Sequence, residues 1–215
     1  MLLRGALGSI SELQPVAVKN SMPLDCYMLT VGIAMLQGAR HEHMYSIMRA
    51  AEIIDAEVEI RKLRKASEVE GVDAFILPGG ESTAMKIASR SENLYSKIWE
   101  QIRENQTPVL GTCAGAILLG KSNDETFQKM DFTVDRNYYG RQIDSFEEIL
   151  EIENYPNFRG VFIRAPAITD VGISKPIAYC NGEIVGCTDG KNMALTFHPE
   201  LTSDSYFHEM WLRNI

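Results

Sequence analysis

Apolar and polar positions along the first half of the chain predict strands and amphipathic helices in alternation. Thr30–Leu36 is an apolar run closed by Gln37-Gly38, as expected of an interior strand that ends in a turn. Apolar side chains then recur at helical spacing, at Met44, Ile47, Met48, Ala51 and Ile54. Further strands are expected at Val58–Leu63, Asp73–Leu77 and Pro108–Leu110, with a helix marked by Leu94, Ile98 and Ile102. Strands and helices joined by short links predict a parallel sheet covered on both faces.

The second half of the chain has the pattern of an antiparallel extension. Strands are expected at Phe132–Val134 and Val161–Arg164. The dipeptides Asn181-Gly182 and Asp189-Gly190 each lie between apolar runs and predict tight primed hairpin turns. The last strand, Met193–Phe197, is followed by a helix over about Ser205–Leu212. The pattern therefore predicts one α/β domain with a mostly parallel sheet and an antiparallel extension.

Composition and charge narrow the class of protein. Of the 215 residues, 45% are hydrophobic and 23% charged, as in an ordinary globular protein. The formal net charge of -8 argues against nucleic acid or a membrane surface as partner, because both attract basic patches. The four cysteines form no C-x-x-C pair and are too sparse for a disulfide scaffold, so a cytoplasmic setting is expected. No apolar run approaches the roughly 20 residues that span a bilayer, and we expect no signal peptide.

A glycine-flanked cysteine carries the strongest chemical signal, in Gly111-Thr112-Cys113-Ala114-Gly115. The motif lies between an expected strand and an apolar helix and has the form of a nucleophile elbow, with cysteine in place of serine. Its glycines permit a sharp turn, and the helix N-terminus favours the thiolate. The backbone N–H of Ala114 is then expected to point toward a developing oxyanion. Taken alone, the pattern fits a turn around a buried structural cysteine equally well.

A second signal is His198-Pro199-Glu200, at the end of the last expected strand. Pro199 disfavours helical geometry at His198, and residues i and i+2 of an extended segment project to the same side. We therefore expect Glu200 to bond one imidazole nitrogen while the other faces a thiol, as a cysteine nucleophile requires. An isolated His-Pro-Glu would more often be a histidine satisfied at a strand end.

A third signal is the paired glycine of Leu77-Pro78-Gly79-Gly80-Glu81-Ser82-Thr83, at another strand end. Paired glycines allow close approach of the backbone to a ligand, and their N–H groups can stabilise an oxyanion. The spacing excludes a P-loop. By itself this segment is merely a tight turn.

The three motifs in this order resemble those of the class I glutamine amidotransferases. Longer stretches narrow the resemblance to the glutaminase subunits of pyridoxal 5′-phosphate synthase: Leu36-Gln37-Gly38, Ile76–Thr83, Gly111–Gly115, Arg136-Asn137, Gly140–Glu147, Val161–Pro166 and Phe197–Thr202. The resemblance extends from about Leu29 to the C-terminus. The stretches Gly140–Glu147 and Val161–Pro166 distinguish this subfamily from other amidotransferases.

The resemblance implies a doubly wound sheet, with Cys113 as nucleophile, His198 as general base and acid, and Glu200 as the residue that orients His198. It also implies a backbone oxyanion hole from Gly80 and Ala114, and glutamine contacts from Gly80, Glu81, Ser82, Arg136, Ile163 and Arg164. Glu81 could pair with the ammonium of glutamine, and either Arg136 or Arg164 with its carboxylate. The implied partners are L-glutamine and the barrel-shaped synthase subunit that receives the ammonia. Neither a cofactor nor a metal is expected.

The chain departs from the family pattern in two places, at its N-terminus and in one loop. Family members begin near Met28, so residues 1–27 are expected to be a poorly ordered extension and residues 28–215 the amidotransferase domain. The connection around Lys121–Lys129 is a few residues shorter than is usual in the family.

Other functions remain open at this stage. The first alternative is the glutaminase subunit of another class I amidotransferase, and the second is a hydrolase or stress protein with a cysteine elbow. A non-catalytic binding subunit is a third. His41 and His43 flank Glu42 near a helix start, and their i, i+2 spacing places them on different helix faces, which argues against a metal site. A solvated surface is favoured for both, with a surface that faces a partner as the alternative.

Overall fold

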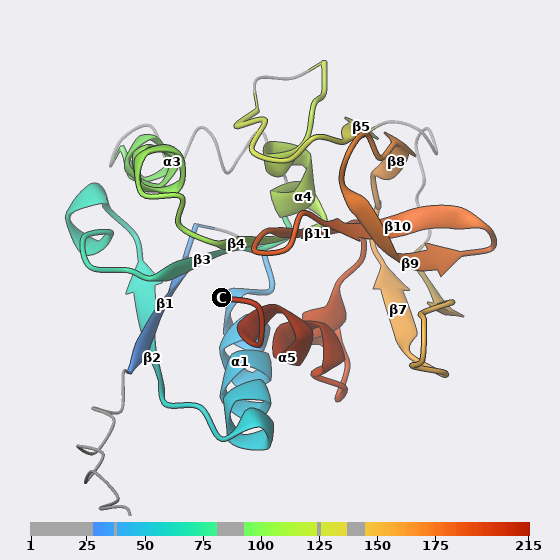
Figure 1. Ribbon diagram of the computed structural model, residues 1–215, viewed down its shortest axis with the longest axis horizontal. Helices are drawn as coiled ribbons and strands as arrows, with labels where there is room; N and C mark the ends of the chain where they lie inside the picture. Colours follow the sequence, from blue (N-terminus) through green and yellow to red (C-terminus); the bar gives the residue numbers. More distant parts are fainter. Residues whose placement is uncertain (1–27, 37, 81–92, 124–125, 137–144) are drawn as a thin grey trace, which may run out of the picture.

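A seven-stranded sheet forms the centre of the molecule (Figure 1), in the strand order β2-β1-β3-β4-β11-β10-β9. The computed structural model describes residues 28–36, 38–80, 93–123, 126–136 and 145–215. The first five strands of this order run parallel, β10 pairs antiparallel with β11, and β9 pairs antiparallel with β10. The strand bounds are β1 Leu29–Ala34, β2 Val58–Leu63, β3 Ala74–Leu77, β4 Val109–Thr112, β9 Lys175–Cys180, β10 Glu183–Thr188 and β11 Met193–Leu195. The predicted α/β class with an antiparallel extension is confirmed.

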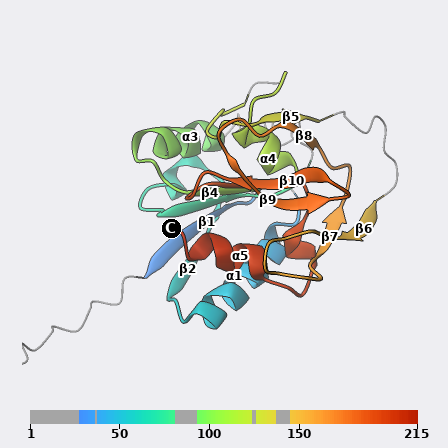
Figure 2. The same cartoon turned by 45° about the vertical axis from the view of Figure 1, so that its right-hand side comes forward.

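Helices cover both faces of the sheet. Helices α1 (Arg40–Ile54) and α5 (Tyr206–Leu212) lie on one face, and α3 (Leu94–Glu104) and α4 (Ala114–Leu119) lie on the other (Figure 2). Strand β3 shows how the core is divided, because successive side chains of a strand point to opposite faces. Phe75 and Leu77 pack into the cluster on the side of α3 and α4, whereas Ala74 and Ile76 pack into the one on the side of α1 and α5. None of the helices in the described ranges has the length and hydrophobicity to span a bilayer.

Two small antiparallel sheets lie beside the extension. One pairs β5 (Thr133–Asp135) with β8 (Ala167–Asp170), and the other pairs β6 (Phe146–Ile149) with β7 (Arg159–Phe162). Short 3-10 helices, η1 (Ala66–Glu68) and η2 (Pro199–Leu201), complete the described elements. The short connection after α4 folds back on that helix, where the N–H of Phe127 donates to the carbonyl of Leu118 at 2.7 Å. The predicted extension, residues 1–27, lies outside the described residues.

The two expected hairpin turns have different outcomes. Asn181 and Gly182 have φ values of 51° and 80°, so the two-residue primed turn is confirmed. At the second site Thr188 pairs with Met193, which leaves a four-residue loop, so the predicted tight turn at Asp189-Gly190 is wrong. The side chain of Asn192 explains the longer loop. Its amide donates to the carboxylate of Asp189 at 2.9 Å, and its oxygen accepts from the N–H of Val109 at 3.1 Å.

Candidate active site

Cys113 lies on a sharp turn between β4 and α4, as the elbow pattern predicts. Its backbone has φ 48° and ψ -106°, a conformation that L-residues rarely adopt. The flanking glycines are required by space. A Cβ on Gly115 would lie 1.9 Å from the carbonyl oxygen of Leu77, and one on Gly111 would lie 2.6 Å from the carbonyl oxygen of Gly115. The turn is therefore possible only with glycine on both sides of Cys113.

His198 and Glu200 form the expected hydrogen bond, but on a different backbone from the one predicted. Nδ1 of His198 donates to Oε1 of Glu200 at 2.8 Å, and both side chains are buried. The N–H of His198 donates to the carbonyl of Val161 at 2.8 Å, which ties the histidine to β7. Glu200 lies in the 3-10 helix η2 rather than in an extended segment, so the predicted i, i+2 geometry is replaced by a tight turn that begins at Pro199.

Gly79 brings the three motifs together. A Cβ at this position would lie 2.3 Å from Cε1 of His198 and 3.1 Å from Cβ of Cys113, so Gly79 packs against both side chains. Gly38, with φ 80°, packs in turn on Gly79, because a Cβ there would lie 1.6 Å from the carbonyl oxygen of Gly79. The N–H of Gly79 donates to Oγ1 of Thr112 at 3.1 Å. Motifs that are far apart in the sequence thus meet at the carboxyl ends of parallel strands.

The electrostatics of this site favour a charged imidazole. Burial disfavours the charged form of His198, but hydrogen bonds with the thiol of Cys113 and the carboxylate of Glu200 outweigh it and raise the pKa of His198 to about 10. Burial raises the pKa of Glu200, while the hydrogen bond from His198 opposes that change. His198 is therefore protonated at neutral pH and positioned to give up a proton.

The structure corrects the prediction for His43. His41 is exposed, as expected, but His43 is fully buried on the face of α1 that packs on the sheet. Its Nε2 lies 3.0 Å from Oγ1 of Thr112, and its Nδ1 lies 3.0 Å from Nε2 of His208. The solvated surface predicted for His43 is wrong because α5, which carries His208, covers this part of α1. Spacing with Ile47 and Ala50, both buried, would have placed His43 on the inner face.

The predicted substrate contacts are only partly brought to this site. The carbonyl of Ile163 accepts from Sγ of Cys113 at 3.7 Å, and the neighbouring Arg164 is exposed with φ 47°. Gly80, with φ 149°, directly follows Gly79. Glu81 and Ser82 lie outside the described residues.

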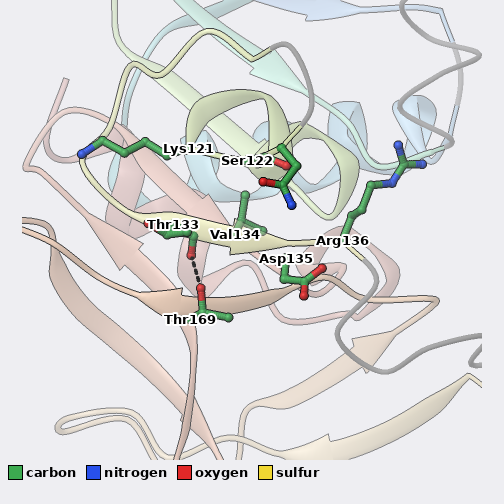
Figure 3. Close-up of a pocket in the computed structure, with 8 residues that line it drawn as sticks. Lys121, Ser122, Thr133, Val134, Asp135, Arg136 and Thr169 are labelled. Atoms are coloured by element: carbon green, nitrogen blue, oxygen red, sulfur yellow. Dashed lines mark hydrogen bonds between the residues drawn. The ribbon is translucent and has the colours of Figure 1, made fainter.

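Arg136 directly follows β5. It helps to line a hollow of about 460 Å³ beside β5 and β8, where the hydroxyl of Thr169 donates to the carbonyl of Thr133 at 3.5 Å (Figure 3). The side chains of Lys121 and Arg136 point in opposite directions there. The lining includes none of Cys113, His198 and Glu200, so the expected role of Arg136 in binding glutamine stays a prediction.

Comparisons with known proteins agree with this architecture. The model of the SNO glutamine amidotransferase family matches residues 33–215. A pyridoxal 5′-phosphate synthase subunit PdxT from Thermococcus onnurineus is 41% identical over 195 residues, covering 86% of this chain and 98% of the relative. The subunit PdxT from Methanocaldococcus jannaschii is 40% identical over 183 residues, covering 83% of this chain and 93% of the relative. A crystal structure of a glutamine amidotransferase superposes with a TM-score of 0.72 at 35% identity, covering 85% of this chain and 97% of that one. The chain belongs to the SNO glutamine amidotransferase family.

Proposed function

We propose that this chain is the glutaminase subunit of a pyridoxal 5′-phosphate synthase, which hydrolyses L-glutamine to L-glutamate and ammonia and passes the ammonia to the synthase subunit. Relatives of that name match most of the chain, at 41% and 40% identity. The observation that carries the proposal is the hydrogen bond of 2.8 Å between His198 and Glu200, on an imidazole whose pKa is also raised by the thiol of Cys113 on its elbow.

The first half of the proposed reaction forms a thioester. The Cys113 thiolate attacks the side-chain amide carbon of glutamine, and the electrons of the carbonyl move onto its oxygen. The N–H of Ala114 is one donor for that oxyanion, because the first N–H groups of a helix have no acceptor within the helix. The N–H of Gly80 is the second proposed donor. When the carbon–nitrogen bond breaks, the imidazolium of His198 gives its proton to the leaving nitrogen, and ammonia departs.

The second half releases glutamate. Neutral His198 takes a proton from water, the resulting hydroxide adds to the thioester, and the carbon–sulfur bond breaks to restore the thiolate. Glu200 accepts the Nδ1–H of His198 throughout and so keeps the other ring nitrogen toward the sulfur. Glu81, Ser82, Ile163 and Arg164 are proposed to hold the substrate, with Arg136 or Arg164 on its carboxylate.

We further propose that the isolated chain is nearly inactive in its cytoplasmic setting until it docks the synthase subunit. Free ammonia is lost unless a consumer is attached. The peptide between Gly79 and Gly80 can change orientation at little steric cost at Gly80, so that either its N–H or its carbonyl faces the oxyanion. Part of the interface is placed near Gly38 and the start of α1, because Gly38 packs directly on Gly79.

The proposal is tested by measuring glutamate release from glutamine by the chain alone and during titration with the synthase subunit. We expect weak activity alone and a rise of up to about 10²–10³-fold at saturation, the typical effect of one oxyanion-hole donor. The Cys113→Ala variant, under the same conditions, should release none. Absence of glutamate at saturating synthase would refute the function, whereas full activity without synthase would refute only the dependence on the partner.

A further inference from the structure

A chain of buried polar side chains lies directly behind Glu200. It consists of Thr112 at the end of β4, His43 on α1 and His208 on α5, each with an exposure of 0%. Nε2 of His43 lies 3.0 Å from Oγ1 of Thr112 and 3.4 Å from Oε2 of Glu200. The other nitrogen of His43, Nδ1, lies 3.0 Å from Nε2 of His208. Three elements far apart in the sequence therefore meet at the back of the proposed triad.

Two atoms, one of Glu200 and one of the cluster behind it, lack an ordinary hydrogen bond within the described part of the chain. They are Oε2 of Glu200 and Nδ1 of His208, both buried. The carboxylate oxygen is the more costly of the two, because a buried anion without a donor loses its hydration without compensation. Nε2 of His43 lies 3.4 Å from this oxygen, at the long end of the hydrogen-bond range.

Both histidines of the cluster are neutral. Burial, followed by the charges of His208 and His198, keeps the pKa of His43 well below its ordinary value. Burial and the charge of Arg49 lower the pKa of His208 to about 3. A neutral imidazole has one donor and one acceptor nitrogen, so the contact between the two rings admits only two arrangements of protons.

The two arrangements differ in which buried hydrogen-bonding atoms they leave without a partner. If Nδ1 of His43 carried the proton, His208 would hold its own proton on a buried Nδ1 without an acceptor, and a lone pair of His43 would face Oε2 of Glu200. If His208 instead donates from Nε2 to Nδ1 of His43, the Nε2–H of His43 is free to donate toward Glu200 and Thr112. The second arrangement leaves only a lone pair unpartnered, which costs less than a buried anion without a donor. The hydroxyl of Thr112 rotates to suit either case.

We infer that His43 is a positioning residue for the proposed triad. Its Nε2–H is shared between Oε2 of Glu200 and Oγ1 of Thr112, in a tautomer that His208 imposes. Oε1 of Glu200 already accepts the hydrogen bond from Nδ1 of His198. A donor to Oε2 therefore fixes the carboxylate at its second oxygen and favours its ionised form. Thr112 also accepts the N–H of Gly79, the glycine against Cys113 and His198. His43 thus positions Glu200, the partner of His198, and through Thr112 the turn at Gly79. It does so without contacting the substrate.

Long-range ¹H–¹⁵N correlation spectra of the chain, labelled with ¹⁵N-histidine, measure directly which ring nitrogen of each histidine carries the proton. The chain has four histidines to assign. We expect His43 and His208 as neutral Nε2–H tautomers near neutral pH. A proton on Nδ1 of His43 would overturn the inference. This measurement requires neither enzymatic activity nor a variant.

The role in catalysis rests on the proposed function and is tested with a matched pair of variants, His43→Gln and His43→Asn, each saturated with synthase. The amide nitrogen of glutamine reaches about as far as Nε2 of histidine, whereas that of asparagine reaches only as far as Nδ1. We expect His43→Asn to lower kcat for glutamine hydrolysis about 10–100-fold with KM little changed, the usual effect of a lost hydrogen bond to a charged group. His43→Gln should keep most of the activity.

The pH dependence of kcat distinguishes a positioning role of His43 from a general disturbance of the fold. Glu200 faces the rings of His198 and His43, the charge of Glu42 and, through His198, the thiol of Cys113. Without the donor on Oε2, the carboxylate takes up a proton at higher pH, so the acid limb of kcat should move upward in His43→Asn and not in His43→Gln. Equal losses in both variants, or an unmoved acid limb, would overturn the inference. An inactive wild-type complex would instead refute the proposed function and leave the tautomer measurement to decide.

Discussion

At Cys113 the backbone has φ 48° and ψ -106°, and such strain costs of the order of 1–3 kcal/mol. The surrounding contacts hold it there. The N–H of Cys113 donates to the carbonyl of Leu195 at 2.8 Å, and Gly115 packs directly on Leu77. The turn places the side chain of Cys113 at the start of a helix, where its thiol helps to raise the pKa of His198. Strain at Cys113 is thus balanced by the packing of its neighbours.

The charge of His198 makes a prediction about stability and pH. A folded-state pKa of about 10 lies above the ordinary value of about 6.5 for an unfolded chain, so protonation favours the folded state. This contribution is complete below about pH 6.5 and is lost as the pH rises toward 10. The difference in Tm between the wild type and His198→Gln should therefore shrink from pH 6.5 to pH 10. A difference that stays constant or grows would show that His198 is not held in its charged form.

At the scale of elements, the site depends on how closely the loop after β3 approaches the turn between β4 and α4. Gly79 is in contact with Cys113 and His198, and Gly38 covers it from the loop before α1. Glycine is required at these positions because there is no room for a side chain, and not only because glycine is flexible. Any side chain at Gly79 would collide with the ring of His198.

Replacing Gly79 with alanine tests this arrangement. The added Cβ would lie 2.3 Å from Cε1 of His198, so the imidazole must move and lose its alignment with Cys113. We expect Gly79→Ala to lower kcat by about 10² or more, since small displacements at a reacting centre cost that much. Gly182→Ala is the control. It strains a turn at φ 80° with open space around its Cβ, and should lower Tm modestly while leaving kcat unchanged. Equal kcat values for the two variants would contradict the packing described.

The sequence predicts most of this arrangement, and its failures have physical causes. The three motifs are local patterns, and Cys113, His198 and Gly79 do meet where parallel strands end. Helical spacing with Ile47 and Ala50 could have placed His43 on the inner face, but its partner there, His208, comes from α5 at the other end of the chain. The Asp189 loop differs from expectation for a similar reason, since Asn192 bonds across to Val109 on another strand. Contacts between distant segments decide these cases.

At the scale of the whole molecule, the site forms only when both ends of the domain are in place. His43 comes from the first helix and His208 from the last, and β11, which precedes His198, inserts beside β4. Both the first helix and the last must therefore be in place for the proposed activity.

We propose that residues 1–27 are dispensable. Strand β1 begins at Leu29, and the family match begins at residue 33. A chain that starts at Met28 should keep the Tm of the full chain and its glutaminase activity with synthase. Thermal unfolding and glutamate release, measured side by side on both chains, check this. A large fall in Tm on truncation would show that the segment packs against the domain.

The central claim is that Cys113 is the nucleophile of a glutaminase. The most direct measurement is mass spectrometry of the complex with synthase, quenched in acid during turnover of L-glutamine and mapped by peptides. The account predicts one glutamyl group in thioester linkage on Cys113, absent from Cys113→Ala. A glutamyl group on Cys180 or Cys187, or glutamate release by Cys113→Ala at the wild-type rate, would contradict it.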